Sequence, residues 1–217
     1  DALKTDNEFI VVLDSRLLDL YKASFKDFKN VVFLDSADNE DLYDYHLPFA
    51  SLGQFFRNSK QDFLNQKIPL LEADKAYTKT LRNRINSGNK HICGISWKSK
   101  NPKIGKSKSM SLEDFKPIFS LPGIDFVDLQ YGNTKKEKKE LKDNFGFELI
   151  EMTDIDNFND IGKLASLINA CDFVVTTSNV TAHIAGALNK KTYQILPYTE
   201  GRIWYWGINE NSSLWYP

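Results

Sequence analysis

The sequence predicts an α/β protein built on Rossmann-like parallel sheets. Short apolar runs rich in β-branched and aromatic residues recur along the 217 residues. Each run is followed by a segment with apolar residues at helical spacing, which is the pattern of βα units stacked on a parallel sheet. A composition of 41% hydrophobic and 26% charged residues is typical of a folded chain rather than a disordered one.

Strands are expected wherever an apolar run is bounded by turn residues or charged segments. In chain order they are Phe9–Asp14, Asn30–Leu34, Ile92–Trp97, Asp125–Gln130, Phe147–Glu151, Asp172–Thr177 and Thr192–Leu196. The expected helices are Arg16–Phe25, Ser111–Ser120, Thr134–Asn144, Asp160–Ala170 and Val180–Leu188. Ser111, with Asp114 three residues later, has the pattern of a capping box that begins a helix. Apart from Leu141, Thr134–Asn144 is almost wholly charged, which predicts a solvated helix with a thin apolar seam.

The turn at residues 87–90 is the best candidate for a domain boundary. After it, five strands and four intervening helices fill the chain, as in one Rossmann-like domain. Before it only two strands are clear. We therefore expect residues 1–88 to be the remainder of an N-terminal α/β domain and residues 89–217 to be a C-terminal Rossmann-like domain.

Composition excludes several classes of protein. A net charge of −1 gives no general attraction for nucleic acid or for an anionic membrane. The apolar stretches are far shorter than the ~18 residues of a membrane span, and the N-terminus lacks the order of a signal peptide. A cytoplasmic chain with at most peripheral membrane association is expected. Cys93 and Cys171 lie in apolar runs without metal-ligand spacing, which predicts neither a disulfide framework nor a zinc site.

A lysine-rich loop follows the predicted strand Ile92–Trp97. The segment SWKSKNPKIGKSKS holds five lysines within eleven residues, as well as Gly105 and four serines. The loop leaves the carboxyl end of a strand and enters a helix at Ser111, where open α/β sheets bind ligands and helix N-termini accept phosphate. The alternative is a flexible, solvated loop. The lysines are Lys98, Lys100, Lys103, Lys106 and Lys108.

A second candidate for anion binding is the unit formed by residues 172–188. A buried strand runs into Ser178 and Asn179, and a helix begins whose first turn exposes free backbone N–H groups. The helix dipole favours negative charge there, and His183 could donate a charge-assisted hydrogen bond. The alternative is that Asn179 only caps the helix and that His183 is a half-buried histidine with satisfied nitrogens.

Aromatic residues gather in the C-terminal segment beside Arg202. They could stack on a base or a sugar, or they could seal the end of the sheet. These residues are Trp204, Tyr205, Trp206, Trp215 and Tyr216. The glycine patterns of dinucleotide and P-loop sites are absent, which disfavours a dehydrogenase. His46 lies just before a Leu-Pro pair in a loop and is a candidate polar group.

Taken in order, several segments resemble the inverting GT-B glycosyltransferases related to the heptosyltransferases (family 9-like), particularly the version found behind tetratricopeptide repeats in bacterial proteins. The strand–turn–helix around His183 is the most specific part of the resemblance, and DLYDYHLPFASLG looks like the segment that closes the family's first domain. The similar segments are ICGISWKSKNP, KSKSMSLEDFKPIFSLPGIDFVDLQYG, FNDIGKLASLINACDFVVTTSNVTAHIAGALNKKTYQILPY and RIWYWG…SLWYP.

The resemblance implies a metal-independent, cofactor-free inverting transfer of a sugar from a nucleoside-diphosphate donor to a glycan, lipid or protein acceptor. The donor would be held mainly by the second domain, and the base would come from the first, with His46 as a candidate. The residues implied for the diphosphate are Lys108, Lys106, Ser178, Asn179, Val180, Thr181 and His183. The residues implied for the nucleotide or sugar are Trp97, Gln130, Arg202 and Trp204.

Two departures from the family keep a second hypothesis open. Members usually carry Asp-Thr or Asp-Ser-Gly where this chain has Ser178-Asn179. The Gly-rich strand–turn–helix that opens the family's first domain has no counterpart in this sequence. The alternative is therefore a non-catalytic module that binds a nucleotide or a glycan in the same cleft.

Overall fold

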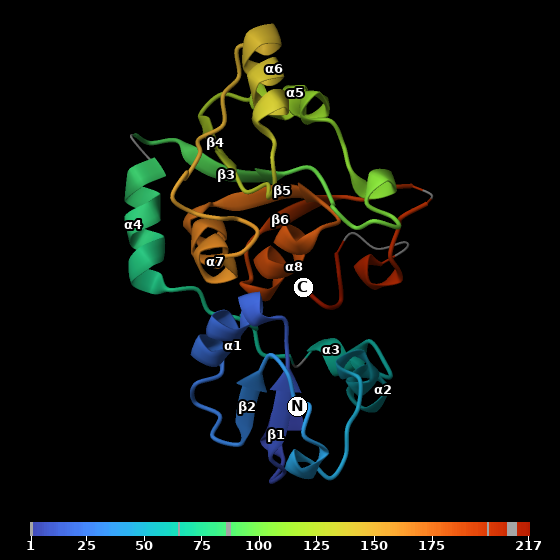
Figure 1. Cartoon of the computed structure of the whole chain (residues 1–217). Helices are drawn as coiled ribbons and strands as arrows, with labels where there is room; N and C mark the ends of the chain where they lie inside the picture. The colour runs from blue at the N-terminus through green and yellow to red at the C-terminus, as the bar shows by residue number, and fades with distance from the viewer. Residues whose placement is uncertain (1, 65, 86–87, 199, 208–211) are drawn as a thin grey trace.

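Two parallel sheets, one of two strands and one of four, organise the chain in the computed structural model (Figure 1). The structure describes residues 2–64, 66–85, 88–198, 200–207 and 212–217. The predicted α/β class with parallel sheets is confirmed. No helix within these ranges is both long enough and apolar enough to cross a membrane.

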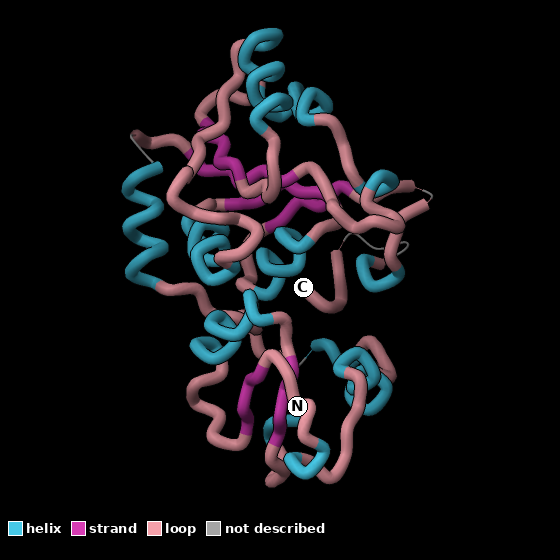
Figure 2. The backbone as a smooth tube through the Cα atoms, in the orientation of Figure 1, coloured by secondary structure: helices cyan, strands magenta, loops and turns pink. Residues whose placement is uncertain are grey.

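The smaller sheet pairs β1 (Phe9–Val12) with β2 (Val31–Leu34), and Phe9 lies opposite Val31. α1 (Leu18–Ser24) connects the two strands, so the pair forms one βαβ unit. Residues 35–64 then run mainly as loops with short helical turns (Figure 2). Among those turns are α2 (Gly53–Phe56) and α3 (Gln61–Leu64), and the longer α4 (Lys75–Ile85) follows.

The larger sheet has the strand order β4-β3-β5-β6, and every pair is parallel. The strands are β3 (His91–Ser96), β4 (Ile124–Asp128), β5 (Phe173–Thr177) and β6 (Thr192–Ile195). β3 is central and almost completely buried, because it is paired on both edges and covered on both faces. These four strands, and β1 and β2 of the smaller sheet, begin and end within two residues of the ranges predicted from the sequence.

The predicted strand Phe147–Glu151 is wrong as a strand. Only a single parallel bridge joins Ile150 to Val127 of β4, with backbone hydrogen bonds from Ile150 N to Phe126 O (2.7 Å) and from Asp128 N to Ile150 O (2.9 Å). Within the described residues these two bonds are the ladder contacts of the segment with β4, and a turn follows at residues 153–154. The bridge still places this segment beyond β4, where the third strand of a Rossmann-like sheet would lie.

Helices cover both faces of the larger sheet (Figure 1). α5 (Lys116–Phe119) and α6 (Lys135–Phe145) lie on one face, where Leu141 is the buried residue of α6, as the charged sequence predicts. α7 (Ile161–Ala170) and α8 (Val180–Ala187) lie on the other. The predicted helix Ser111–Ser120 is split, because a 3-10 turn at Leu112–Phe115 precedes α5, although its capping box forms as expected.

The N-terminal part packs against α7 and α8. Leu20 of α1 belongs to the same buried cluster as Leu164 and Ile168 of α7. The backbone N–H groups of Leu70 and Leu71 both donate to the carbonyl of Ala187 at the end of α8. α4 also packs on α7, although it precedes the predicted boundary. The boundary between residues 88 and 89 stays a prediction, and residue 87 of its turn lies outside the described residues.

Gly94 in β3 gives a test of how closely the sheet is packed. A Cβ at this position would overlap the Leu129 side chain and lie 3.2 Å from the Sγ of Cys171. We expect Gly94→Ala to lower the free energy of unfolding by about 1–3 kcal/mol, the usual cost of overpacking a core. Urea denaturation measures it, with Gly88→Ala as the control because a Cβ there meets nothing within 4 Å. Equal losses in both variants would contradict this packing.

Candidate functional site

The candidate site lies at the carboxyl ends of β3 and β5, which we call the rim of the sheet. From β3 the chain moves outward to β4 and then returns to β5 on the opposite edge of β3. This reversal is the topological switch point, where open parallel sheets bind ligands. Two segments leave the sheet there: the lysine-rich loop after β3, and the turn Ser178–Asn179 that leads into α8.

Two buried amide side chains tie the strand ends together. Asn179 donates through Nδ2 to the Oγ of Ser96 (2.8 Å) and to the carbonyl of Lys98 (3.2 Å), which joins the end of β5 to the end of β3. Gln130, beyond the end of β4, accepts through Oε1 from Trp97 N (2.8 Å), Lys98 N (2.8 Å) and Ser96 Oγ (3.0 Å). We call Gln130, Asn179 and Ser96 the amide network.

The start of α8 is built from buried polar residues. Asn179 is the N-cap, and its Oδ1 accepts from the N–H of Thr181 (2.9 Å). Thr181 is completely buried, and its hydroxyl has no hydrogen-bond partner among the described residues. Ser178 is buried as well, and its hydroxyl accepts from the indole N–H of Trp206 (2.9 Å). The exposed N1 residue Val180 adds a backbone N–H to this positive end of the helix.

Lys108 is the buried lysine of the loop, with 8% of its surface exposed. Burial lowers the pKa of its ammonium group. Within the described part of the chain, no carboxylate lies within the 4 Å of an ion pair with it. The backbone of Gly201 packs on its side chain, since a Cβ at that glycine would lie 3.0 Å from Cγ of Lys108. Among the described residues, the site therefore holds a partly desolvated cation without a counter-ion.

His183 of α8 lies near this cation. Burial, and then the positive charge of Lys108, lower the pKa of His183 to about 4, so the imidazole is neutral at pH 7. A hydrogen bond donated by His183 in this state would be neutral, whereas the sequence analysis expects a charge-assisted one, and its role toward a bound anion stays a prediction. Both ring nitrogens already have partners: Nδ1 lies 3.1 Å from the hydroxyl of Tyr216, and Nε2 lies 3.2 Å from the hydroxyl of Tyr205.

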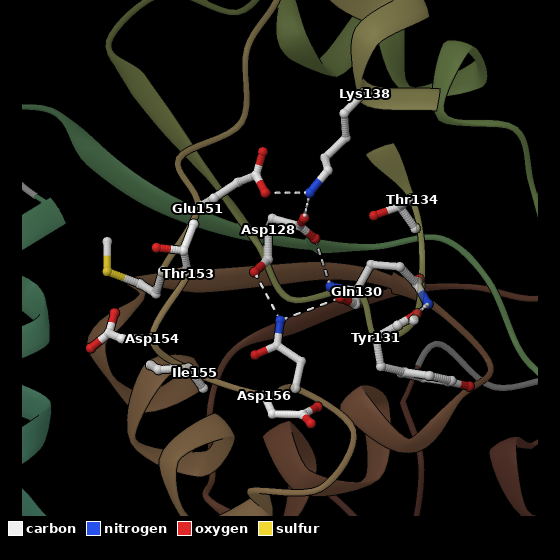
Figure 3. Close-up of a pocket in the computed structure, with 13 residues that line it drawn as sticks. Asp128, Gln130, Tyr131, Thr134, Lys138, Glu151, Thr153, Asp154, Ile155 and Asp156 are labelled. Carbon is white, nitrogen blue, oxygen red and sulfur yellow. Dashed lines mark hydrogen bonds and ion pairs between the residues drawn. The ribbon is translucent and has the colours of Figure 1, made fainter. Parts of the chain in front are cut away.

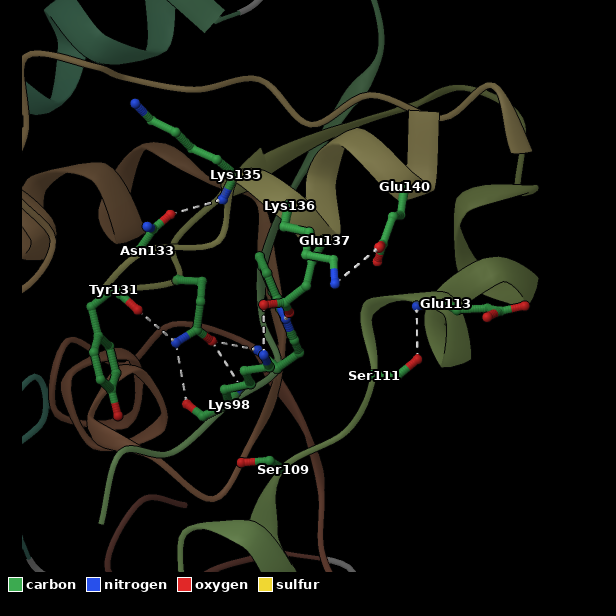
Figure 4. Close-up of polar contacts among 12 residues, drawn as sticks. Lys98, Ser109, Ser111, Glu113, Tyr131, Asn133, Lys135, Lys136, Glu137 and Glu140 are labelled. Atoms are coloured by element: carbon green, nitrogen blue, oxygen red, sulfur yellow. Dashed lines mark hydrogen bonds and ion pairs between the residues drawn. The ribbon is translucent and has the colours of Figure 1, made fainter. Parts of the chain in front are cut away.

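The other lysines of the loop do not share the environment of Lys108. Lys98 pairs with Glu137 of α6 at 2.6 Å, and both are seen in Figure 4. Lys100 lies 5.6 Å from the centroid of the Phe158 ring. Lys103 is exposed, and Lys106 is exposed beside a groove against α6. The alternative of a solvated loop therefore describes much of this segment, but not Lys108.

The residues implied for the nucleotide or sugar have different environments. The Trp97 residue is completely buried in this structure and its ring donates through Nε1 to Glu137 (2.8 Å). Gln130 belongs to the amide network. Arg202 is half-buried and donates to the carbonyl of Gly207 (3.0 Å), whereas Trp204 is 70% exposed. Their roles toward a ligand stay predictions.

His46, the candidate base, is exposed in the N-terminal part and lies edge-on to Tyr43, with ring centroids 6.0 Å apart. In the described part of the chain, no three His, Cys, Asp or Glu side chains cluster so that they could hold a metal ion. The predictions of the base and of metal independence remain untested by this arrangement.

A polar cavity of about 460 Å³ adjoins the rim beyond β4 (Figure 3). Lys138 of α6 bridges two of its carboxylates, Asp128 (2.7 Å) and Glu151 (2.5 Å). Burial raises the pKa of Asp128 despite this pairing. Asn157 donates to the carbonyls of Asp128 and Gln130, and its own Oδ1 is buried without a partner among the described residues. Sequence patterns missed this cavity, because its walls come from β4, α6 and the loop after residue 150.

The parallel strand order, which reverses between β3 and β5, is that of a Rossmann-like α/β protein. No protein-family model matches it. It is similar to protein FlbA of Caulobacter vibrioides, with 25% identity over 90% of this chain, and it spans about a third of that relative's length (35%). It is also similar to the solved structure of Escherichia coli ADP-heptose lps heptosyltransferase II, with 17% identity, a TM-score of 0.47, and coverage of 64% of this chain and 43% of that one.

Removing the Asn179 side chain should loosen the rim. Asn179→Ala deletes the N-cap of α8 and the two bonds to the end of β3. We expect a loss of about 2–3 kcal/mol in the free energy of unfolding, with about 1 kcal/mol from the cap and the remainder from the buried bonds. Urea denaturation measures it. Asn101→Ala, which removes an exposed turn-capping amide, is the control and should cost less than about 1 kcal/mol.

His183 should make the fold sensitive to acid. Its pKa of about 4 lies below the value of about 6.5 in an unfolded chain, so the unfolded state binds more protons between these values. The contribution of the neutral ring is present above pH 6.5 and is lost as the pH falls to 4, by about 3 kcal/mol. We expect His183→Gln to remove this part of the pH dependence in urea titrations from pH 7 to pH 4. Parallel pH profiles of the two proteins would show that His183 is not held neutral.

Proposed function

We propose that this chain is the donor-binding part of a metal-independent, inverting glycosyltransferase whose donor is a nucleoside-diphosphate sugar. The observation that carries the proposal is Lys108, a lysine with 8% of its surface exposed and no counter-ion among the described residues, whose positive charge acts on His183 in the first turn of α8. A buried charge is costly unless something compensates it. An anion bound at the rim would supply that compensation, and a diphosphate has enough oxygens to reach both the ammonium and the helix N–H groups.

The positive charge of Lys108 and the neutral ring of His183 are compatible with a reaction in which a diphosphate is the leaving group. An acceptor hydroxyl would attack the anomeric carbon from the face opposite the diphosphate, and the bond from that carbon to the diphosphate oxygen would break. A base would take the hydroxyl proton. Lys108 would stabilise the negative charge that develops on the leaving group, with the dipole of α8 and a neutral hydrogen bond from His183 in support. The ammonium would then do the electrostatic work that a divalent cation does in other transferases.

The charges that line the polar cavity indicate which end of the donor would lie there. It is lined by Gln130 and by several carboxylates, including Asp128, Glu151 and Asp156, against one cation, Lys138. This excess of negative charge repels phosphate and favours groups that donate hydrogen bonds, such as ribose hydroxyls and the amino group of a base. We propose that the nucleoside lies on this side, with the diphosphate at Lys108 and α8.

Titration calorimetry with UDP, GDP and ADP, followed by a donor-hydrolysis assay with the sugar forms, tests the function. Binding of at least one diphosphate together with slow hydrolysis of its sugar form supports the transferase. Binding without any turnover favours the alternative, a non-catalytic module. If none of the three nucleotides binds, both forms of the proposal fail.

Substitution of Lys108 tests the site itself. Lys108→Ala should weaken the binding of the preferred diphosphate by about 1.5–3 kcal/mol, because a charged hydrogen bond in a partly dry site is lost. His183→Ala should cost less, about 0.5–1.5 kcal/mol, because the ring is neutral. Lys103→Ala, an exposed lysine of the same loop, is the matched control and should change affinity little. Equal effects of the two lysine variants would show that burial of Lys108 has no part in binding.

A further inference from the structure

Tyr216 and Tyr205 hold the imidazole of His183 from both sides. Their hydroxyls lie within hydrogen-bonding distance of Nδ1 and Nε2 respectively. The ring of Trp206 lies against the imidazole, with centroids 4.6 Å apart. These aromatic residues come from the C-terminal segment, whereas His183 is on α8. The segment therefore fixes the orientation of one side chain of the candidate site.

The two hydroxyls have different surroundings. Tyr216 packs against the larger hydrophobic cluster, and burial raises the pKa of its hydroxyl to about 12. Its ring lies so close to Gly186 that a Cβ there would be 2.8 Å from the Cβ of Tyr216. Tyr205 lies on the 3-10 turn Trp204–Trp206, next to the exposed ring of Trp204. Tyr216 is thus the fixed partner of the imidazole and Tyr205 the one nearer the surface.

The direction of the two hydrogen bonds follows from these surroundings. Among the described residues, Nδ1 of His183 is the acceptor within hydrogen-bonding distance of the Tyr216 hydroxyl. A hydroxyl in an apolar environment that does not donate is left unsatisfied at a cost. Donation from Tyr216 to Nδ1 would satisfy this hydroxyl, and Nδ1 would then carry no hydrogen. The ring hydrogen is then on Nε2, and it points to the hydroxyl of Tyr205.

The segment that carries Tyr205 also contacts two of the residues implied for the diphosphate. The segment that carries Tyr205 has Gly201 against Lys108 before it and Trp206 bonded to Ser178 after it. A ligand oxygen near Lys108 and the start of α8 would approach Nε2 from this direction. Such an oxygen accepts a hydrogen bond, as the hydroxyl of Tyr205 does now.

We propose that Tyr216 is a positioning residue that fixes His183 as the Nε2–H tautomer, so that a diphosphate oxygen can replace the Tyr205 hydroxyl at Nε2. This inference rests on the proposed function, since it assumes a diphosphate at the rim. Tyr216 itself does not touch the ligand. Gly186 serves the same arrangement by leaving room for the Tyr216 ring.

The test combines NMR of the imidazole nitrogens with UDP titration of the full chain. The nitrogen chemical shifts report which ring nitrogen carries the hydrogen, and a loss of packing alone does not determine this. The variants are Tyr216→Phe, Tyr205→Phe and, as an exposed control, Tyr193→Phe. In the wild type we expect an unprotonated Nδ1 and a protonated Nε2. Tyr216→Phe should mix the tautomers and weaken UDP binding about fivefold, the effect of one neutral hydrogen bond. Tyr193→Phe should leave the UDP affinity at the wild-type value, and Tyr205→Phe should raise it, because the ligand oxygen then displaces no hydroxyl from Nε2.

Gly186→Ala gives a second route to the same result, because it displaces the Tyr216 ring while keeping its hydroxyl. It should also mix the tautomers. If the wild type binds UDP, and Tyr216→Phe keeps both the wild-type tautomer and the wild-type affinity, the inference is overturned and the proposed function stands. If the wild type binds none of UDP, GDP and ADP, the proposed function and this inference fail together. Weaker UDP binding by Tyr205→Phe than by Tyr216→Phe would also overturn the inference, because Tyr205 would then be the positioning residue.

Discussion

The amide network is the interaction on which the rest of the rim depends. Parallel strands that end side by side leave backbone N–H and carbonyl groups without ladder partners, and these groups need hydrogen bonds when they are buried. A primary amide both accepts and donates, so Gln130 can satisfy the N–H groups of Trp97 and Lys98 while Asn179 binds the carbonyl of Lys98. A carboxylate could not donate in this way. The network thus fixes the lysine-rich loop relative to α8.

Among the described residues implied for the diphosphate, Lys108 is the buried charged group. Lys108 is positive but desolvated, while His183 is neutral, because protonation of a buried ring next to an ammonium is unfavourable. The fold therefore avoids two neighbouring buried cations and keeps one, together with the partial charge of the α8 N-terminus. Preorganised charge of this kind needs little rearrangement when an anion arrives, which is the property that makes fixed electrostatics effective in catalysis.

Much of the fold could be predicted because the strands are short apolar runs, and such runs can be recognised from the local sequence alone. The prediction of a strand at Phe147–Glu151 was wrong. The segment forms a single bridge to β4, and the number of residues that pair with a neighbouring strand is not encoded in the local pattern. The site was harder. The sequence places Lys108 in the loop after β3 and His183 in the first turn of α8, and their roles toward a ligand stay predictions. It does not show that Gly201 packs on Lys108 or that aromatic residues of the C-terminal segment contact the imidazole. Contacts between such distant segments leave no periodic signal in the sequence.

The contact between Gly186 and Tyr216 has a consequence for how this chain can change in evolution. Any larger residue at position 186 would collide with the fixed Cβ of Tyr216, which side-chain rotation cannot move away. Replacement at one position therefore displaces the other residue and favours a compensating change there. Across homologous chains the two positions should covary, although they are distant in sequence, and they should diversify together in lineages that have abandoned the histidine of α8.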